Sequence, residues 1–447
     1  GTNIACAHSL IRKIIMSAVP RFTTALSGLP LGLERQLLDK SVAIEHWLRS
    51  QWLEHTPPFY GSVDLRNSGF KLAPVDTNLY PGGFNNLNPD FHALCVQAAQ
   101  TAVEKICPDA RDALLIPENH TRNQFYLQNV ATLARILRLA GTNVRIGSLL
   151  PGLAGPMDVD LPDGKKLTLE PLKRNGSRIG LDGFDPCVVV LNNDLSSGIP
   201  DILRDVEQPL FPPTHAGWAV RRKSHHFAAY NDVAKEFAQF LGIDPWMINP
   251  YFEMCGKINF QEHQGEECLA GYVAEILDDI RAKYKEYGIS DDPFVIVKAD
   301  AGTYGMGIMT VKDASEVRGL NRKQRNKMAV VKEGLEVHEV LVQEGVYTLE
   351  TVREAVAEPV VYMIDRFVVG GFYRLNTQRG KDQNLNAPGM QFEPLAFAEP
   401  CSSPDPDDPD CVPNRFYAYG VIARLALLAA SIELERTESA ADEPEAA

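Results

Sequence analysis

A single lysine stands between an apolar run and a group of glycines. Lys298 closes the run that starts at Phe294, and glycines follow at positions 302, 305 and 307. A lysine at the end of a buried strand is costly unless it meets an anion, and glycines let backbone amides approach phosphate oxygens. The segment therefore predicts a nucleotide triphosphate site. An ordinary hairpin turn, with Lys298 paired to a carboxylate, is the alternative.

Oxygen-bearing side chains recur at even spacing near the other end of the chain. Asp64 lies twelve residues before Asp76, and Asn78 follows two residues later. In a hairpin over residues 61–79, Asp76 and Asn78 share one face, and Asp64 can meet them across the ladder. Such hard ligands suit Mg²⁺, which bridges proteins to polyphosphates. A solvated hairpin face is the competing interpretation.

Polar residues also follow a short apolar strand over residues 113–116. They lie in a loop before a helix over 124–139, and a strand over 144–147 comes next. Loops at the carboxyl ends of such strands commonly bind ligands. We therefore predict substrate-binding roles in this loop, with a simple cap for the helix as the alternative, and in the loop after the hairpin; the residues are Glu118, Asn119, Thr121 and Arg122, with Asn85 and Asn86.

The hydrophobic pattern predicts the elements that must position these residues. Beyond those already named, it favours helices over 5–55, 89–107, 226–241, 268–287 and 417–434, a polar hairpin region over 158–185, and strands over 187–191, 294–311, 336–344 and 359–376. Strands and helices are interleaved, so the fold class is α/β (α+β).

Composition restricts the function further. The net charge of −14 argues against a dedicated nucleic-acid binder, and no apolar run approaches the ~18 residues of a membrane helix. Eight cysteines without a CxxC pair predict reduced thiols in a cytoplasmic protein. A bridge between Cys401 and Cys411, which bracket a loop rich in proline and aspartate, is the alternative.

The densest basic cluster runs from Arg221 to His226. We expect it to form the solvated start of a helix rather than to face an anionic site. The paired histidines lack an acidic partner at metal spacing, so zinc is not predicted.

The order of features after Lys298 resembles the ATP-grasp superfamily, in which two lobes grip ATP. A strand over 340–346 enters a polar linker suited to the adenine edge, and a hairpin over 360–376 follows. The resemblance implies an ATP site made by Lys298, the three glycines, Gln343, Glu344 and Val346, with Lys257 as the second phosphate lysine. It also implies that Asp365, Arg374 and Asn376 lie on a hairpin that approaches substrate.

The acidic hairpin stands at the opposite end from its usual place, as in the circularly permuted ATP-grasp fold of glutathionylspermidine synthetase. Three stretches, 70–86, 116–123 and 298–307, look like a bacterial glutamate–cysteine ligase family, and the resemblance spans about 20–435. It implies that ATP and Mg²⁺ activate glutamate as an acyl phosphate, which the amine of cysteine captures. Arg66, Lys298 and Arg374 would then be catalytic.

Two other functions remain open from the residues alone. One is a different carboxylate–amine ligase, such as a glutathione synthetase, and the other is a nucleotide-binding protein without turnover. The expected layout is a helical segment over 1–60, the metal hairpin and a helix over 61–110, an α/β substrate lobe over 111–215, a helical connection over 216–290, a nucleotide lobe over 291–400 and a closing helix with a tail over 401–447.

Overall fold

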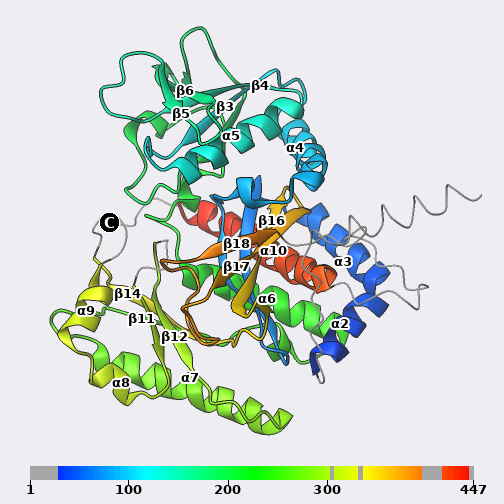
Figure 1. The fold of residues 1–447 in the computed structure, drawn as a ribbon, viewed down its shortest axis with the longest axis vertical. Coiled ribbons are helices and arrows are strands. Elements are labelled where there is room, and N and C mark those ends of the chain that lie inside the picture. The colour runs from blue at the N-terminus through cyan, green and yellow to red at the C-terminus, as the bar shows by residue number, and fades with distance from the viewer. Residues whose placement is uncertain (1–28, 303–306, 331–335, 395–414, 442–447) are drawn as a thin grey trace, which may run out of the picture.

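The computed structural model describes residues 29–302, 307–330, 336–394 and 415–441. Three sheets organise this part of the chain, and helices cover or join them (Figure 1). The predicted mixed class of strands and helices is confirmed.

The central sheet combines strands from both ends of the sequence. Its order is β18-β17-β16-β1-β2, with the short β15 also paired to β16. β1 runs antiparallel to β16, so the early hairpin completes a sheet that the late strands begin (Figure 1). The strands are β1 (Tyr60–Asn67), β2 (Leu72–Asn78), β15 (Thr351–Val352), β16 (Ala355–Ile364), β17 (Phe367–Asn376) and β18 (Gln391–Pro394).

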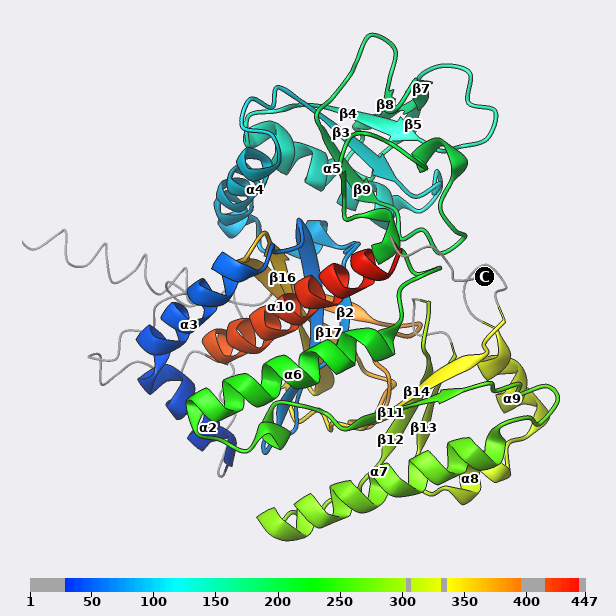
Figure 2. The same ribbon diagram turned by 180° about the vertical axis from the view of Figure 1, so that it is seen from behind.

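Helices cover one face of the central sheet (Figure 2). They are α2 (Leu29–Asp39), α3 (Ser41–Glu54), α6 (Lys223–Leu241) and α10 (Arg415–Ala441). Val63 and Leu65 pack in this core, while Ser62 and Asp64 alternate with them and line a cleft on the other face. The stretch Phe416–Glu438 of α10 is long and apolar enough to cross a membrane, but 83% of its most apolar window is buried, as in a core helix.

A second sheet forms the upper lobe in Figure 1, with the order β10-β9-β3-β4-β6-β5. Its first five strands run parallel, and β5 is antiparallel to β6. α4 and α5 pack together, and α4 also contacts β16 and β17, so it joins this lobe to the central sheet. The elements are α4 (His92–Ile106), β3 (Asp112–Pro117), α5 (Gln124–Leu139), β4 (Asn143–Ser148), β5 (Met157–Asp160), β6 (Lys166–Pro171), the separate pair β7 (Lys173–Asn175) and β8 (Arg178–Gly180), β9 (Val188–Asn192) and β10 (Leu210–Phe211).

The third sheet is antiparallel, with the order β11-β14-β12-β13, and α7 packs against it. Its elements are β11 (Phe252–Gly256), α7 (Glu266–Tyr287), β12 (Val295–Ala299), β13 (Ile308–Val311), α8 (Ser315–Arg318), α9 (Arg322–Ala329) and β14 (Glu339–Glu344). Five single 3₁₀ turns complete the described structure: η1 (Phe84–Asn86), η2 (Pro89–Phe91), η3 (Asp201–Leu203), η4 (Thr214–Ala216) and η5 (Pro245–Met247).

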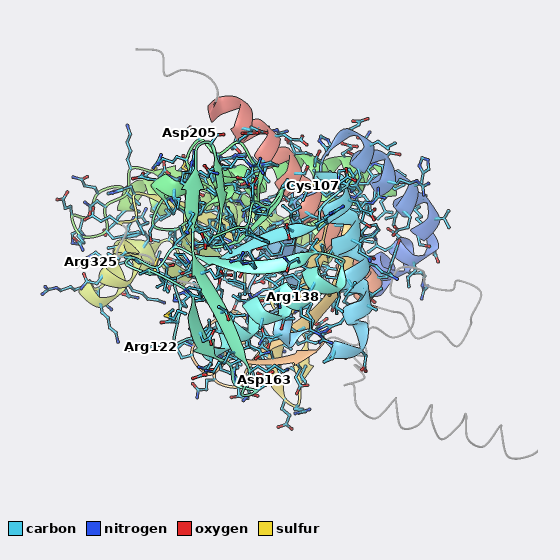
Figure 3. The ribbon with its side chains drawn as sticks, turned by 90° about the horizontal axis from the view of Figure 1, so that it is seen from above. Cys107, Arg122, Arg138, Asp163, Asp205 and Arg325 are labelled. Atoms are coloured by element: carbon cyan, nitrogen blue, oxygen red, sulfur yellow. A yellow bond between two sulfur atoms is a disulfide. The ribbon has the colours of Figure 1, made fainter. Side chains whose placement is uncertain are left out.

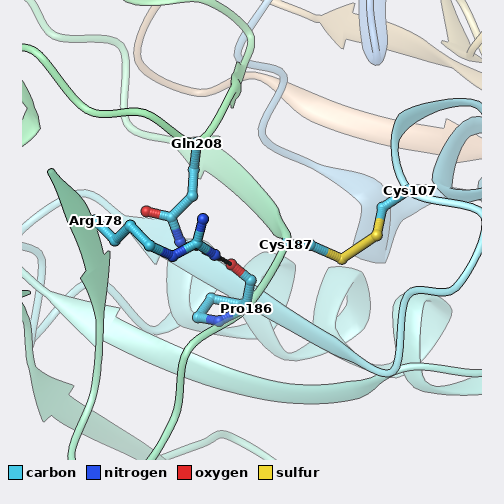
Figure 4. The surroundings of a disulfide bond; sticks show 5 residues. All are labelled: Cys107, Arg178, Pro186, Cys187 and Gln208. Atoms are coloured by element: carbon cyan, nitrogen blue, oxygen red, sulfur yellow. Dashed lines mark hydrogen bonds between the residues drawn. A yellow bond between two sulfur atoms is a disulfide. The ribbon is translucent and has the colours of Figure 1, made fainter.

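The expectation that all cysteines are reduced thiols is wrong for one pair. Cys107 and Cys187 form a disulfide across 80 residues of sequence (Figure 4). Cys107 directly follows α4 and Cys187 directly precedes β9, so packing of α4 against the upper lobe brings the two ends together. The backbone carbonyl of Pro186 accepts a hydrogen bond from Gln208 at 2.7 Å, which fixes the chain beside the bridge. Cys401 and Cys411 lie outside the described residues.

Candidate active site

A cleft of about 870 Å³ lies where the three sheets meet. Side chains from β1, β2, β16 and β17 line it, and so do residues of β12 and β14 from the third sheet. Residues of the upper lobe, among them Glu118, Tyr126 and Asp194, also line it. The early hairpin and the late strands that were predicted to meet therefore share one cleft.

The hairpin brings the residues predicted as metal ligands close together. Asp64 and Asp76 are direct cross-strand partners, Asn78 pairs with Ser62, and all four residues line the cleft. A β-bulge between Asp64 and Leu65 leaves Val75 as an extra residue on β2. The carbonyl of Val75 accepts a hydrogen bond from Lys298.

Lys298 links the hairpin to the third sheet. It is buried, and its Nζ donates to Val75 O at 2.7 Å and to Gln343 Oε1 at 2.8 Å. Burial lowers the pKa of Lys298 to about 7, an effect that Asp76 opposes and Lys223 reinforces. Gly302 and Gly307 adopt φ values of 98° and 62°, which favour glycine, and Gly302 lines the cleft. Gly305 lies outside the described residues.

The basic cluster does not form a solvated helix start, so that expectation is wrong. Arg221, Lys223 and His226 are buried, and Lys223 lines the cleft. Lys223 Nζ donates to Asp76 Oδ1 at 2.8 Å and lies 4.1 Å from the centre of the Trp218 ring. Burial alone would raise the pKa of Asp76, but Lys223 and Lys298 lower it well below the ordinary aspartate range.

A network of two arginines and two carboxylates lines the cleft, with Arg66 and Glu358 buried and Arg374 and Asp64 half-buried. Arg374 Nη1 donates to Asp64 Oδ2 and to Glu358 Oε1, both at 2.7 Å. Arg66 Nε donates to Glu358 Oε2 at 3.1 Å, and its two Nη atoms donate to the carbonyls of Val346 and Gln383. Burial raises the pKa of Asp64, although Arg374 opposes this shift.

Three buried donors on residues that line the cleft find no acceptor in the described part of the chain. They are Trp218 Nε1, Gln343 Nε2 and Arg374 Nε. Buried donors are nearly always satisfied in native proteins, so these atoms point to acceptors that a ligand supplies.

The candidates for nucleotide binding divide into two groups. Gln343, Glu344 and Val346 line the cleft at the end of β14 and in the linker beyond it. The Glu344 carboxylate accepts from Lys71 Nζ at 2.7 Å and from Trp246 Nε1 at 3.0 Å, so its side chain is engaged within the protein. Lys257 is exposed just after β11 and is not among the residues that line the cleft.

The predicted substrate residues also divide. Asn85, Asn86 and Glu118 line the cleft, whereas Asn119, Thr121 and Arg122 do not. Arg122 is exposed and lies at the outer edge of the molecule in Figure 3. The N-cap of α5 is a different residue from the four predicted ones, namely Asn123, whose Oδ1 accepts from Tyr126 N.

Mg²⁺ fits the hairpin by the chemistry of the donor set. Asp64 and Asp76 are directly opposed carboxylates that now hold the cations Arg374 and Lys223. No three His, Cys, Asp or Glu side chains gather as a metal centre within the described ranges. Mg²⁺ commonly takes one or two carboxylates together with water and phosphate oxygens, so this pair with Asn78 suffices.

Several cleft residues escaped the sequence reasoning. Glu358 carried a signal, since it is a carboxylate inside the apolar strand Ala355–Ile364, and Lys223 carried one within its basic cluster. Other residues of the cleft had no such signal, because their types are common in cores and loops; they include Tyr80, Asp194, Trp218, Tyr362, Asn384, Met390 and Phe392.

A model of the family described as glutamate–cysteine ligase matches residues 34–434. The chain belongs to the glutamate–cysteine ligase family. It is therefore an ATP-dependent ligase with glutamate–cysteine ligase activity, and the predicted family is confirmed.

Comparison with solved structures agrees with this membership. A candidate gamma-glutamylcysteine synthetase from Methylobacillus flagellatus KT is 66% identical, with a TM-score of 0.87, over 94% of this chain and 99% of that one. The D-alanyl-alanine synthetase A of Vibrio cholerae O1 biovar eltor shows 12% identity and a TM-score of 0.30, over 63% of this chain and 74% of that one, a likeness too weak to bear on the fold. The comparison with curated proteins finds no match.

Proposed function

We propose that this cleft joins the γ-carboxylate of L-glutamate to the amine of L-cysteine in two steps. A γ-carboxylate oxygen attacks the γ-phosphorus of ATP, and ADP leaves. The cysteine nitrogen then attacks the carbonyl carbon of the acyl phosphate, loses a proton and expels phosphate. The products are γ-glutamylcysteine, ADP and a phosphate that carries one oxygen from glutamate.

The observation that carries the proposal is the contact between Lys298 and the bulged hairpin. Lys298 Nζ lies 2.7 Å from Val75 O, next to Asp76 in the sequence, so the phosphate lysine and the metal ligands border one space. Phosphoryl transfer needs mainly positioning and charge neutralisation. The unsatisfied Arg374 Nε and Gln343 Nε2 support an acceptor-rich ligand in the same space.

In this proposal Asp64, Asp76 and Asn78 hold Mg²⁺, which when bound neutralises charge on the β- and γ-phosphates. The Oδ1 of Asn78 accepts from Tyr80 N at 2.9 Å, and this contact orients the amide oxygen at the end of β2. Lys298, the glycines of the loop, Gln343, Glu344 and Val346 bind ATP, and Lys257 would join them from the end of β11.

Arg374 is the better placed of the two proposed catalytic arginines. Its Nε has no acceptor in the described structure, whereas all three nitrogens of Arg66 donate to protein groups. We propose that Arg374 donates to the reacting oxygens. Arg66 instead positions Glu358 and the linker at Val346. Asn85, Asn86 and Glu118 face the cleft from the upper lobe side and serve the amino acids, with Asn119, Thr121 and Arg122 as outer candidates.

The layout favours a circularly permuted ATP-grasp enzyme, and we propose separately that it acts in the cytoplasm. The acidic hairpin precedes the glycine loop in sequence, yet β1 pairs with β16, which follows that loop. A permutation that moves the hairpin from the end of the fold to its beginning accounts for this pairing. The substrates are small molecules, and we propose neither a nucleic acid nor a membrane as a partner.

An isotope experiment tests the acyl phosphate. Glutamate labelled with ¹⁸O in its γ-carboxylate is incubated with ATP, Mg²⁺, cysteine and the protein. We expect a γ-linked dipeptide and one ¹⁸O atom in each released phosphate, both measured by mass spectrometry. Dipeptide with unlabelled phosphate would refute the proposed route, and absence of the dipeptide would refute the reaction.

A further inference from the structure

Lys223 is a cation that the predicted ATP site does not include. It is 8% exposed and lines the cleft, and its Nζ lies 2.8 Å from Asp76 Oδ1. The other face of the ammonium group rests on the Trp218 ring. The partner of Lys223 is therefore Asp76, a carboxylate that we assign to Mg²⁺. Lys223 and Mg²⁺ would compete for this carboxylate.

Asp76 lies between two lysines in the cleft. Arg66 and Arg374 contact Glu358 and Asp64, whereas the charges of both Lys223 and Lys298 act on Asp76. Of these two lysines, Lys223 is the one that forms an ion pair with Asp76. If a metal ion takes Asp76, Lys223 loses this partner, and because a buried unpaired charge is costly it then needs another anion.

The position of Lys223 is tied to the strand that carries Lys298. The backbone N–H of Lys223 donates to Asp300 O at 2.8 Å. The Asp300 carboxylate accepts from Ser224 N and from Ser224 Oγ, both at 2.7 Å. Asp300 lies two residues after Lys298 and just before the glycine loop, so both lysines are fixed to the same end of β12.

We propose that Lys223 is a third phosphate-binding cation, which Asp76 holds until the metal takes its place. When Mg²⁺ binds Asp76, the ammonium group of Lys223 turns to the phosphate oxygens delivered with it. No bond is made or broken in this exchange. The inference rests on the proposed function, since it assigns a further residue to the same site.

Removal of Lys223 then has two effects of opposite sign. In Lys223→Met, Asp76 loses its competitor, so we expect Mn²⁺, used as a Mg²⁺ probe, to bind the nucleotide-free protein about five- to tenfold more tightly. ADP in the presence of EDTA loses a cationic partner and should bind about tenfold more weakly. Electron paramagnetic resonance measures the first quantity, and equilibrium dialysis measures the second.

Three further variants make the result specific. Lys223→Arg keeps the charge and should stay within about threefold of the wild type in both measurements. Lys105→Met removes a lysine from another ion pair, with Asp365 outside the cleft, and should match the wild type. Lys223→Gln repeats the charge removal should the methionine variant fail to fold.

Each outcome decides the question. Tighter binding of Mn²⁺ together with weaker binding of ADP by the variant supports the exchange, since a misfolded protein would not gain metal affinity. Unchanged binding, or weakening of both ligands, overturns the role of Lys223 while the ligase reaction still stands. If the wild type binds neither ADP nor Mn²⁺, the proposed function fails as well.

Discussion

At the scale of single residues, Lys298 is subject to opposing effects. Burial disfavours its charged form and lowers its pKa to about 7, while Asp76 favours the charge. A bound triphosphate would add several negative charges next to the ammonium group. The pKa of Lys298 should therefore rise when nucleotide binds.

This shift predicts proton uptake on nucleotide binding. At pH 7.5 most Lys298 side chains are neutral in the free protein, so we expect uptake of roughly half to three quarters of a proton per ADP bound. Affinity should fall as the pH rises from 7 to 9, because the neutral form must first be protonated. Calorimetry in two buffers of different ionisation enthalpy measures the uptake. Lys298→Arg, which stays charged, should show neither effect; uptake that persists in this variant would assign it to another group.

Asp76 provides a second test at this scale. Asp76→Asn removes one metal-binding carboxylate, and we expect ligase activity to fall about 10²-fold or more. ADP in EDTA should bind at least as well as to the wild type, since a negative charge beside the phosphates is gone. Asp160→Asn, at an exposed position of β5, serves as the control. Equal losses of ADP binding and activity would instead indicate a damaged fold.

The sequence predicted some site residues because their spacing carried geometric information. The even spacing of Asp76 and Asn78 fixed one face, and the pairing of Asp64 with Asp76 followed from the hairpin. Lys223 was misassigned because its residue type does not reveal burial, which depends on the distant Asp76 and Trp218. Residue types and their spacing do not predict contacts between residues that are far apart in the sequence.

At the scale of elements, β2 is tied to helix α10 through one buried arginine. Arg221 of the segment before α6 donates from Nη1 to Thr77 O, between Asp76 and Asn78, at 2.8 Å. Its Nε and Nη2 donate to the two carboxylate oxygens of Glu433 on α10 at 2.8 and 2.9 Å. The pair is buried, so α10 positions the proposed metal strand through Arg221.

Glu433→Gln tests this support. Burial would raise the pKa of Glu433, but Arg221 and His226 lower it to about 2. The ionised form therefore stabilises the fold above the unfolded pKa of about 4.5, and the stabilisation is lost as the pH falls toward 2. We expect the variant to lose about 3 kcal/mol of unfolding free energy at pH 7 and about half as much at pH 3.

Urea denaturation at several pH values measures this difference. Glu435→Gln, two residues after Glu433 and exposed on the same helix, provides a comparison of similar chemistry. If the loss of unfolding free energy in Glu433→Gln is the same at pH 7 and at pH 3, the ion pair is not the cause of that loss.

Element boundaries were predicted best where local signals were complete. The helix over 124–139 matches α5 at both ends, because Asn123 caps its start and Gly141 follows its end with a φ of 100°. The order of the central sheet was less accessible, since almost three hundred residues separate β1 from β16. Only the resemblance to a permuted fold indicated that they meet.

At the scale of the whole molecule, the bridge between Cys107 and Cys187 ties the connecting helix α4 to the upper lobe. We expect Cys187→Ser to lose about 2–4 kcal/mol of unfolding free energy under oxidising conditions. A reducing agent should bring the wild type to the level of the variant. Cys268→Ser, at an exposed free cysteine, should have little effect.

Chemical denaturation with and without reductant provides this comparison, and peptide mapping identifies the bridge directly. Alkylation in intact cells before lysis then reports whether the pair is oxidised in the compartment where the protein works. If both Cys107 and Cys187 react with the alkylating agent in the purified, unreduced protein, the pairing is contradicted.

The pairing of β1 with β16 also has a consequence for biosynthesis. During translation the acidic hairpin leaves the ribosome early, but its neighbour in the sheet starts only at Ala355. The nascent hairpin must wait with an open edge for almost three hundred residues until β16 is synthesised. The proposed site therefore cannot assemble before that point, and a chain that stops short of Ala355 cannot form it.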